Sequence, residues 1–210
     1  MEWRRSDHGL QGDGPSPEGH PGRACRHGRH ARQDESRRVK APVLETERLR
    51  LRPAVPGDLE AATAMWADEG VVRFIGGKPR SRQEVWFALL RGAGLWMLKG
   101  HGYWVVTDRE TGAFLGEGGF ADFQRGLPAH LVPGPEAGWA FAPAAWGRGL
   151  ATEAVAAMHT WLDAALPGVS SCVIEPGNTA SARVAAKLGY LQTGDTMLGG
   201  VVVNTYRRGA

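Results

Sequence analysis

The sequence has few of the features that mark secreted and membrane proteins. It contains only two cysteines in 210 residues, which excludes a disulfide framework and a zinc site made of four cysteines. No apolar run reaches the length of about 18 residues that a membrane-spanning helix needs. The first residues also lack the apolar stretch of a secretory signal. We therefore expect a cytoplasmic protein without a membrane partner.

Excess positive charge is confined to the first fifth of the chain. The whole sequence carries a formal net charge of +3. Residues 1–41 contain nine Lys and Arg against six Asp and Glu, whereas residues 42–210 contain sixteen of each. A neutral balance over four fifths of the chain argues against nucleic acid as the main partner.

The N-terminal segment has too little apolar surface to form a core. Within residues 1–41, Leu10 and Val39 are the only members of the set Leu, Ile, Val and Phe. We predict that these residues form a disordered basic leader, which translation from Val39 would largely remove. Three scattered ligand-type side chains do not define a site in such a segment, and we expect no metal there: Cys25, His27 and His30.

Residues 42–210 have the pattern of one mixed α/β domain. Strands are predicted at Arg48–Arg52, Tyr103–Thr107, Phe114–Phe120, Glu136–Phe141, Ser170–Ile174 and Val201–Tyr206, with a short one at Tyr190–Gly194. Helices are predicted after an Asp58 N-cap, after the Ser81–Glu84 capping box, at Ala151–Leu166 and at Thr179–Leu188.

A glycine-containing turn between the strand at 136–141 and the next helix suggests anion binding. Gly147 and Gly149 allow a ligand to approach the backbone closely. The free N–H groups and the dipole at the start of the helix attract negative charge. Arg148 adds the one charged side chain of the turn. The ligand indicated by these features is a phosphate or pyrophosphate.

Four ordered motifs resemble the GNAT superfamily of acetyl-CoA-dependent N-acetyltransferases, in its RimJ/RimL-like branch. Trp146-x-x-Gly149-x-Ala151 is similar to the phosphate-binding motif of that superfamily. The other three motifs are Leu44–Arg52, similar to the opening strand; Gly112–Gly116, similar to the central hairpin; and Asn178–Tyr190, similar to the second cofactor-side segment. The resemblance covers about residues 43–208.

The resemblance implies a GNAT-like sheet, mostly antiparallel, with two splayed central strands and flanking helices. It implies that acetyl-CoA lies between the strands at 136–141 and 170–174. The implied binding residues are Trp139, Ala140 and Phe141 for pantetheine, Trp146, Gly147, Arg148, Gly149, Leu150, Ala151 and Thr152 for pyrophosphate, and Asn178 and Ser181 further along. The expected partners are acetyl-CoA and an amine acceptor, with a homodimer as a possible assembly and no metal.

The implied reaction is direct transfer of acetyl to a primary amine, either a protein N-terminus or a small molecule. Glu136 is the first candidate for the base and Ser181 for a hydrogen-bond donor to the leaving thiol. Many relatives place a tyrosine acid where this chain has Ala185. Second choices for proton transfer are Glu117, His130 and Tyr206.

Two other functions are compatible with parts of the sequence. A dinucleotide-binding unit would use the Gly147 and Gly149 turn, but Thr152 occupies the third glycine position. A GNAT-like module that binds acyl-CoA or a partner without catalysis is the other alternative, given Ala185. Acceptor specificity is expected in residues 66–80 and 122–135. Trp96 is assigned to a short loop near the acceptor side, where its ring could line a substrate pocket, although a place in the core is favoured.

Overall fold

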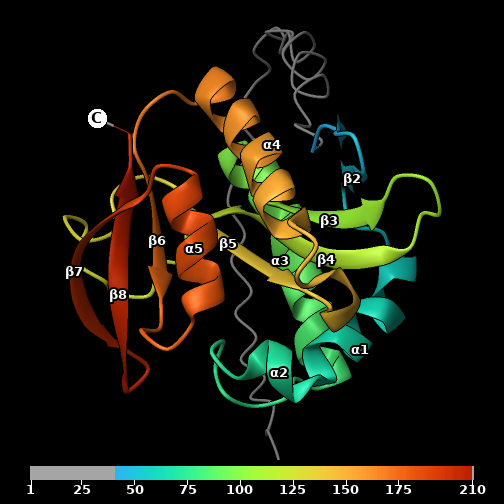
Figure 1. Cartoon of the computed structure of the whole chain (residues 1–210), viewed down its shortest axis with the longest axis horizontal. Helices are drawn as coiled ribbons and strands as arrows, with labels where there is room; N and C mark the ends of the chain where they lie inside the picture. Colours follow the sequence, from blue (N-terminus) through green and yellow to red (C-terminus); the bar gives the residue numbers. More distant parts are fainter. Residues whose placement is uncertain (1–40, 210) are drawn as a thin grey trace, which may run out of the picture. The chain divides into compact units, whose positions relative to one another are not determined.

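The computed structural model describes residues 41–209, which form a mixed α/β domain (Figure 1). The strands are β1 (Leu44–Glu45), β2 (Leu49–Arg52), β3 (Tyr103–Asp108), β4 (Phe114–Ala121), β5 (Glu136–Phe141), β6 (Ser170–Ile174), β7 (Leu191–Leu198) and β8 (Val201–Arg208). The helices are α1 (Leu59–Ala67), α2 (Glu69–Val72), α3 (Arg82–Lys99), α4 (Leu150–Ala165) and α5 (Thr179–Lys187), with short 3-10 turns η2 (Pro56–Asp58) and η3 (Pro143–Ala145).

The strands form one sheet in the order β1-β2-β3-β4-β5-β6-β8-β7. Within residues 41–209, β5 and β6 are the only neighbours that run parallel, and they pair at a single register position, Glu136 with Ser171. Every other neighbouring pair is antiparallel. The expected mostly antiparallel sheet with splayed central strands is therefore confirmed.

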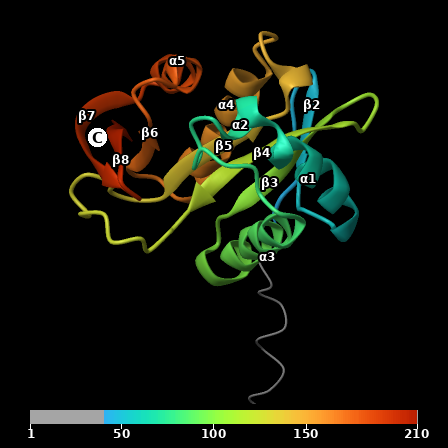
Figure 2. The ribbon, with the colours of Figure 1, turned by 90° about the horizontal axis from the view of Figure 1, so that it is seen from below.

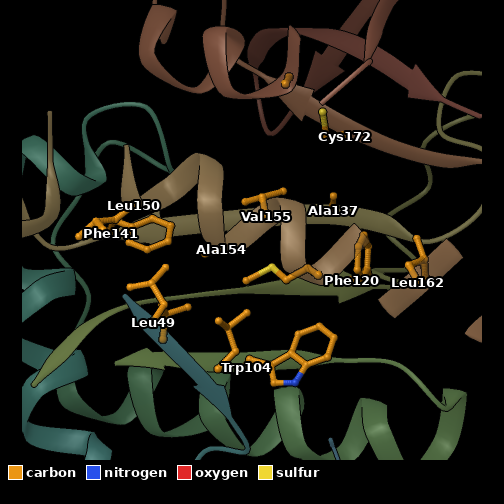
Figure 3. Close-up of a cluster of buried hydrophobic side chains, with 14 of the residues drawn as sticks. Leu49, Trp104, Phe120, Ala137, Phe141, Leu150, Ala154, Val155, Leu162 and Cys172 are labelled. Atoms are coloured by element: carbon orange, nitrogen blue, oxygen red, sulfur yellow. The ribbon is translucent and has the colours of Figure 1, made fainter. Parts of the chain in front are cut away.

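Helices cover both faces of the sheet, and α3 lies on the opposite side from α4 and α5 (Figure 2). The side chains of α1 and α3 pack with Ala140 in one apolar cluster. Those of α4, including Val155 and Leu162, pack with Trp104 and Phe120 in a larger one (Figure 3). Ala41 is buried in this larger cluster, so the packed domain already includes that residue.

Capping explains where α3 begins and ends. The Ser81 hydroxyl accepts a hydrogen bond from the Glu84 N–H, and the Glu84 carboxylate accepts one from the Ser81 N–H. This is the reciprocal capping box expected from the sequence. Gly100 ends the helix with φ of 72°, a left-handed conformation that glycine adopts without steric cost.

The assignment of Trp96 to a loop is wrong. Trp96 lies in the last turns of α3 and is 3% exposed. Its ring makes edge contacts with Trp104, at 4.6 Å between centroids, and with Trp161, at 5.0 Å. This packing stabilises a helix that continues through Gly92 and Gly94, where intrinsic propensity is low.

The prediction that Asp58 is the N-cap residue of α1 is confirmed in position but not in hydrogen bonding. Asp58 precedes α1, but its side chain makes no capping hydrogen bond to that helix. The carboxylate instead accepts hydrogen bonds from the Val55 N–H at 2.8 Å and from the Arg52 guanidinium at 2.6 and 2.8 Å. It therefore ties the end of β2 to the turn before α1.

The other predicted elements agree with the structure within a residue or two, except for the C-terminal hairpin, whereas β1, α2 and the two 3-10 turns were not predicted. β7 and β8 are longer than the segments predicted at 190–194 and 201–206. No helix of the described part of the chain is both long and apolar enough to cross a membrane. The predictions for residues 1–40, including those for Cys25, His27 and His30, fall outside the described residues.

Candidate active site

A cleft opens where β5 and β6 separate. The Ser171 N–H donates to the Pro135 carbonyl at 3.1 Å, and beyond Glu136 and Ser171 the two strands no longer pair. The cleft has a volume of about 530 Å³, within the range of about 300 to 1,000 Å³ that is usual for small-molecule sites. Four predicted site residues in addition to Glu136 line it: Trp139, Ala140, Asn178 and Ser181.

The β5 edge of this cleft presents unpaired backbone groups. The Ala142 N–H donates to the Leu115 carbonyl at 2.9 Å, and in the same register Ala140 pairs with Glu117. Because hydrogen-bonded pairs alternate along an antiparallel ladder, the N–H and C=O of Trp139 point away from β4, toward β6. They are free to bond an extended ligand as a neighbouring strand would.

The glycine turn lies past the C-terminal end of β5 and opens α4. Gly147 and Gly149 have φ of 70° and 77°, so both need the left-handed conformation that glycine favours. In the described chain the N–H groups of Leu150, Ala151 and Thr152 donate to no carbonyl or side chain, and the first helical bond runs from Glu153 to Gly149. Three parallel donors thus face outward at the positive end of the α4 dipole.

A second network holds this turn in place. The Arg48 guanidinium donates to the Glu153 carboxylate at 2.5 and 2.7 Å and to the Arg148 carbonyl at 3.0 Å. The Thr46 hydroxyl donates to the same carboxylate at 2.6 Å. The opening strands are therefore tied to the first turn of α4. Thr46 and Arg48 belong to the Leu44–Arg52 motif, but nothing in the local sequence indicates that they bind Glu153, which is 107 and 105 residues away from them.

Among the residues predicted to bind pyrophosphate, the side chains of Trp146 and Arg148 bond to nearby backbone carbonyls. The Trp146 indole N–H donates to the Phe141 carbonyl at 2.8 Å, and its ring lies against Gly70 in α2. Trp146 therefore joins the end of β5 to α2, while its side chain stays 49% exposed. The Arg148 side chain is exposed and makes only a long contact, 3.4 Å, with the Ala144 carbonyl.

Asn178 and Ser181 stand together at the start of α5. The Asn178 side-chain oxygen accepts from the Ser181 N–H at 3.1 Å and so caps the helix. This leaves the Asn178 NH₂ group and the Ser181 hydroxyl without an internal partner among residues 41–209. Trp139, Asn178 and Ser181, which line the cleft, and Gly147–Thr152, which lie beyond its lining at the start of α4, are together called the backbone side of the site below.

The opposite part of the cleft is charged. We call its six residues the charged side: Trp66, Arg80, Arg91, Glu117, Arg125 and Glu136. Glu136 forms an ion pair with Arg125, whose guanidinium also lies 4.5 Å from the centre of the Phe123 ring. Burial raises the pKa of Glu136, and Arg125 opposes that rise.

Glu117 is the less constrained of the two carboxylates. It is 8% exposed and accepts one side-chain hydrogen bond, from the Trp66 indole N–H at 3.2 Å. Burial raises its pKa, while the nearby charge of Arg80 and the bond from Trp66 act in the opposite direction. A carboxylate with a raised pKa in a cleft is suited to accept a proton near neutral pH.

Two other side chains proposed for proton transfer do not line the cleft. His130 is exposed in the loop before β5. Tyr206 is 8% exposed and packs in the larger apolar cluster. Ala185 is fully buried in that cluster as well, so its position offers no proton donor to the cleft.

The topology does not match a dinucleotide-binding unit. Such a unit needs consecutive parallel strands joined by crossover helices. In residues 41–209, β5 and β6 pair in parallel at one position only. The glycine turn therefore belongs to a different kind of fold from the one that its spacing alone would permit.

Comparisons with known proteins agree with this fold. The profile of the Acetyltransferase (GNAT) domain family matches residues 48–191. The N-acetyltransferase YoaA of Bacillus subtilis is 30% identical over 156 residues, 73% of this chain and 85% of YoaA. YkkB of the same organism is 38% identical over 94 residues, 43% of this chain, and the match spans about half of YkkB, 52%.

Solved structures give the same result. A GnaT-family acetyltransferase from Bordetella pertussis has a TM-score of 0.71 at 30% identity, over 80% of this chain and 99% of that one. RimL, a ribosomal L7/L12 alpha-N-protein acetyltransferase solved in complex with coenzyme A, has a TM-score of 0.65 at 16% identity, over 80% and 98%. The fold expected from the RimJ/RimL-like motifs is thus confirmed. The chain belongs to the GNAT acetyltransferase family.

Proposed function

We propose that this protein transfers the acetyl group of acetyl-CoA directly to a primary amine. The amine nitrogen attacks the thioester carbonyl carbon, the C–N bond forms and the C–S bond breaks. The amine loses a proton to the protein or to water, and the CoA sulfur leaves as a thiolate that takes up a proton. The observation that carries the proposal is the splayed β5–β6 cleft with free backbone donors on one side and buried carboxylates on the other.

The backbone side suits the long, partly anionic body of acetyl-CoA. The free N–H and C=O of Trp139 can bond the amide groups of the pantetheine arm in strand fashion. The N–H groups of Leu150, Ala151 and Thr152 can hold the pyrophosphate, as helix N-termini do. Gly147, Arg148 and Gly149 form the approach to these donors, and Asn178 offers its free NH₂ group.

Proton transfer is assigned to the charged side. An attacking amine must be neutral, so a base has to remove its proton. We place Glu117 ahead of Glu136 for this role, because Glu136 is held by Arg125 whereas Glu117 accepts a single bond from Trp66. Both carboxylates line the same cleft.

We assign to Ser181 the stabilisation of the leaving thiolate of CoA. The Ser181 hydroxyl lines the cleft and has no internal partner in the described residues, because Asn178 already caps the helix. A hydroxyl donor next to the sulfur stabilises the charge that develops as the C–S bond breaks. Ala185 cannot supply this donor.

The proposed function is tested by binding and by turnover. Acetyl-CoA is titrated into the full-length protein while tryptophan fluorescence is recorded, and free CoA is then measured across a panel of amines and peptides. We expect saturable acetyl-CoA binding and amine-dependent CoA release. Binding of NAD without binding of acetyl-CoA would contradict the proposal. Acetyl-CoA binding without thiol release for any amine would favour a non-catalytic module.

A further inference from the structure

Trp66 connects two oppositely charged groups on the charged side. Its indole N–H donates to the Glu117 carboxylate at 3.2 Å. The Arg80 guanidinium lies over the same ring, 3.5 Å from its centroid. Trp66 is 4% exposed and therefore fixed by the core. One rigid side chain thus positions an anion at its edge and a cation on its face.

Arg80 is a partly buried cation without an internal counter-ion. Within residues 41–209 its guanidinium forms no salt bridge and donates no side-chain hydrogen bond. Burial lowers the pKa of Arg80, and the charge of Arg91 adds to this effect, whereas Glu117 opposes it. A buried charge that lacks a hydrogen-bonded partner is costly, so the site favours an incoming anion.

None of the neighbouring charged side chains in the described part of the chain forms a salt bridge with Arg80. Arg125 and Glu136 neutralise each other in an ion pair. Glu84 is exposed and engaged with Ser81 in the capping box of α3. Arg91 lines the same cleft without a salt bridge among the described residues. The charged side therefore presents one buried carboxylate and two arginines that no carboxylate of residues 41–209 pairs with.

We infer that the acceptor is a small zwitterionic amine that carries a carboxylate, such as an amino acid. Its ammonium group lies at Glu117 before proton removal, and its carboxylate binds the Arg80 guanidinium, with Arg91 adding attraction. A guanidinium matches the two oxygens of a carboxylate in a bidentate geometry. The inference rests on the proposed acetyltransferase function and names its substrate class.

The test compares matched acceptors on the full-length protein. Free CoA release is measured with α-, β- and γ-amino acids and with their carboxamides, which keep the amine and remove the negative charge. Aminomethylphosphonate tests whether another anion replaces the carboxylate. We expect at least one amino acid to exceed its carboxamide in kcat/KM by about ten- to hundredfold, the factor of one charge-assisted hydrogen-bonded contact.

Variants locate this preference. Arg80→Met should bring the ratio close to one by raising KM for the amino acid, while KM for acetyl-CoA is unchanged. Arg80→Lys keeps the charge but not the fork geometry and should give an intermediate ratio. Arg207→Met is the matched control, because Arg207 is exposed on β8 and does not line the cleft. Thermal unfolding of each variant verifies that it is folded.

Failure of this inference differs from failure of the proposed function. Carboxamides that match or exceed every amino acid, or a preference that survives in Arg80→Met, would overturn the inference. It is also overturned if acetyl-CoA binds but no amino acid accepts acetyl. A protein that does not bind acetyl-CoA at all would instead contradict the proposed function. A phosphonate preferred over all carboxylates would also overturn the inference, because the site would then select a different anion.

Discussion

The two sides of the cleft are built from different material. The backbone side relies on N–H and C=O groups that a strand edge and a helix start leave unpaired, within 43 residues of sequence from Trp139 to Ser181. The charged side relies on side chains drawn from α1, the segment before α3, α3, β4, the following loop and β5. Binding by backbone depends on chain conformation, whereas binding by side chains depends on packing between distant segments.

The largest predicted effect comes from replacing the Glu117 carboxylate of the charged side. Glu117→Gln keeps the shape but cannot accept a proton, so kcat/KM should fall by about a hundredfold or more. Since burial raises the pKa of Glu117, wild-type activity should decline as the pH falls through that raised value. The variant should lose this decline, which pH–rate profiles will show.

A control separates this effect from a general loss of charge. Glu60→Gln removes an exposed carboxylate that pairs with Arg82 outside the cleft, and it should leave the profile unchanged. If Glu117→Gln retains both rate and profile while Glu136→Gln loses them, the order of the two carboxylates is reversed.

The backbone side is tested next by changing chain conformation alone. Gly149→Ala adds a methyl group at φ of 77°, which strains the turn by about 1 kcal/mol and tilts the donors of α4. KM for acetyl-CoA should rise about tenfold, because the tilt weakens about one hydrogen bond from a backbone N–H to the charged pyrophosphate. Steady-state kinetics with acetyl-CoA as the varied substrate measures the change.

Gly112→Ala is the matched control for that strain. Gly112 has φ of 72° in the turn between β3 and β4, and a methyl group there meets nothing within 4 Å. The variant should lose similar stability with KM for acetyl-CoA unaltered. Equal KM changes in both variants would show that strain, not donor geometry, is responsible.

Ser181→Ala tests whether the backbone side also acts on the leaving group. Removing one hydroxyl donor from a developing thiolate should lower kcat by several-fold to about tenfold, with little change in KM. Ser181→Cys and Ser181→Thr provide graded donors. A kcat that is unaffected in Ser181→Ala would contradict the assigned role.

The smallest effect is expected at Asn178. Asn178→Ala removes the helix cap and the free NH₂ group, which should raise KM for acetyl-CoA by about threefold to tenfold and cost about 1 kcal/mol of stability. Asn178→Ser restores a capping oxygen without the amide. If KM returns to the wild-type value in Asn178→Ser, the residue acts only as a cap.

The difference between the backbone side and the charged side also explains which parts of the site the sequence could predict. Gly147 and Gly149 precede a strongly periodic helix, so local pattern and chain conformation agree there. Trp66 and Glu117 are 51 residues apart, and nothing local indicates that an indole joins them. Residues 66–80 and 122–135 are the segments in which acceptor specificity is predicted. Trp66, Arg80 and Arg125 fall within them, whereas Glu117 and Arg91 do not. A homodimer and a cytoplasmic location remain predictions.

Tertiary packing also decided elements that local pattern misjudged. Trp96 is predicted to lie in a loop, whereas α3 continues through Gly92 and Gly94 to Lys99 and is stabilised by aromatic packing of Trp96. Asp58 has the residue type of an N-cap, yet Arg52 and Val55 capture its carboxylate. At Trp96 contacts from other segments, and at Asp58 bonds to residues three and six positions earlier, outweighed a local preference of about 1 kcal/mol.

The single register contact between β5 and β6 has a consequence for cooperativity. Hydrogen bonding across the sheet is nearly interrupted there, with β1–β5 on one side and β6, β8 and β7 on the other. A molecule lying along Trp139 would restore the missing rungs and act as a removable strand. Amide hydrogen exchange should then slow in β5 and β6 together when acetyl-CoA is present. Binding of acetyl-CoA between β5 and β6 would thus couple the motions of the two parts of the sheet, which fluctuate more independently when no ligand is bound.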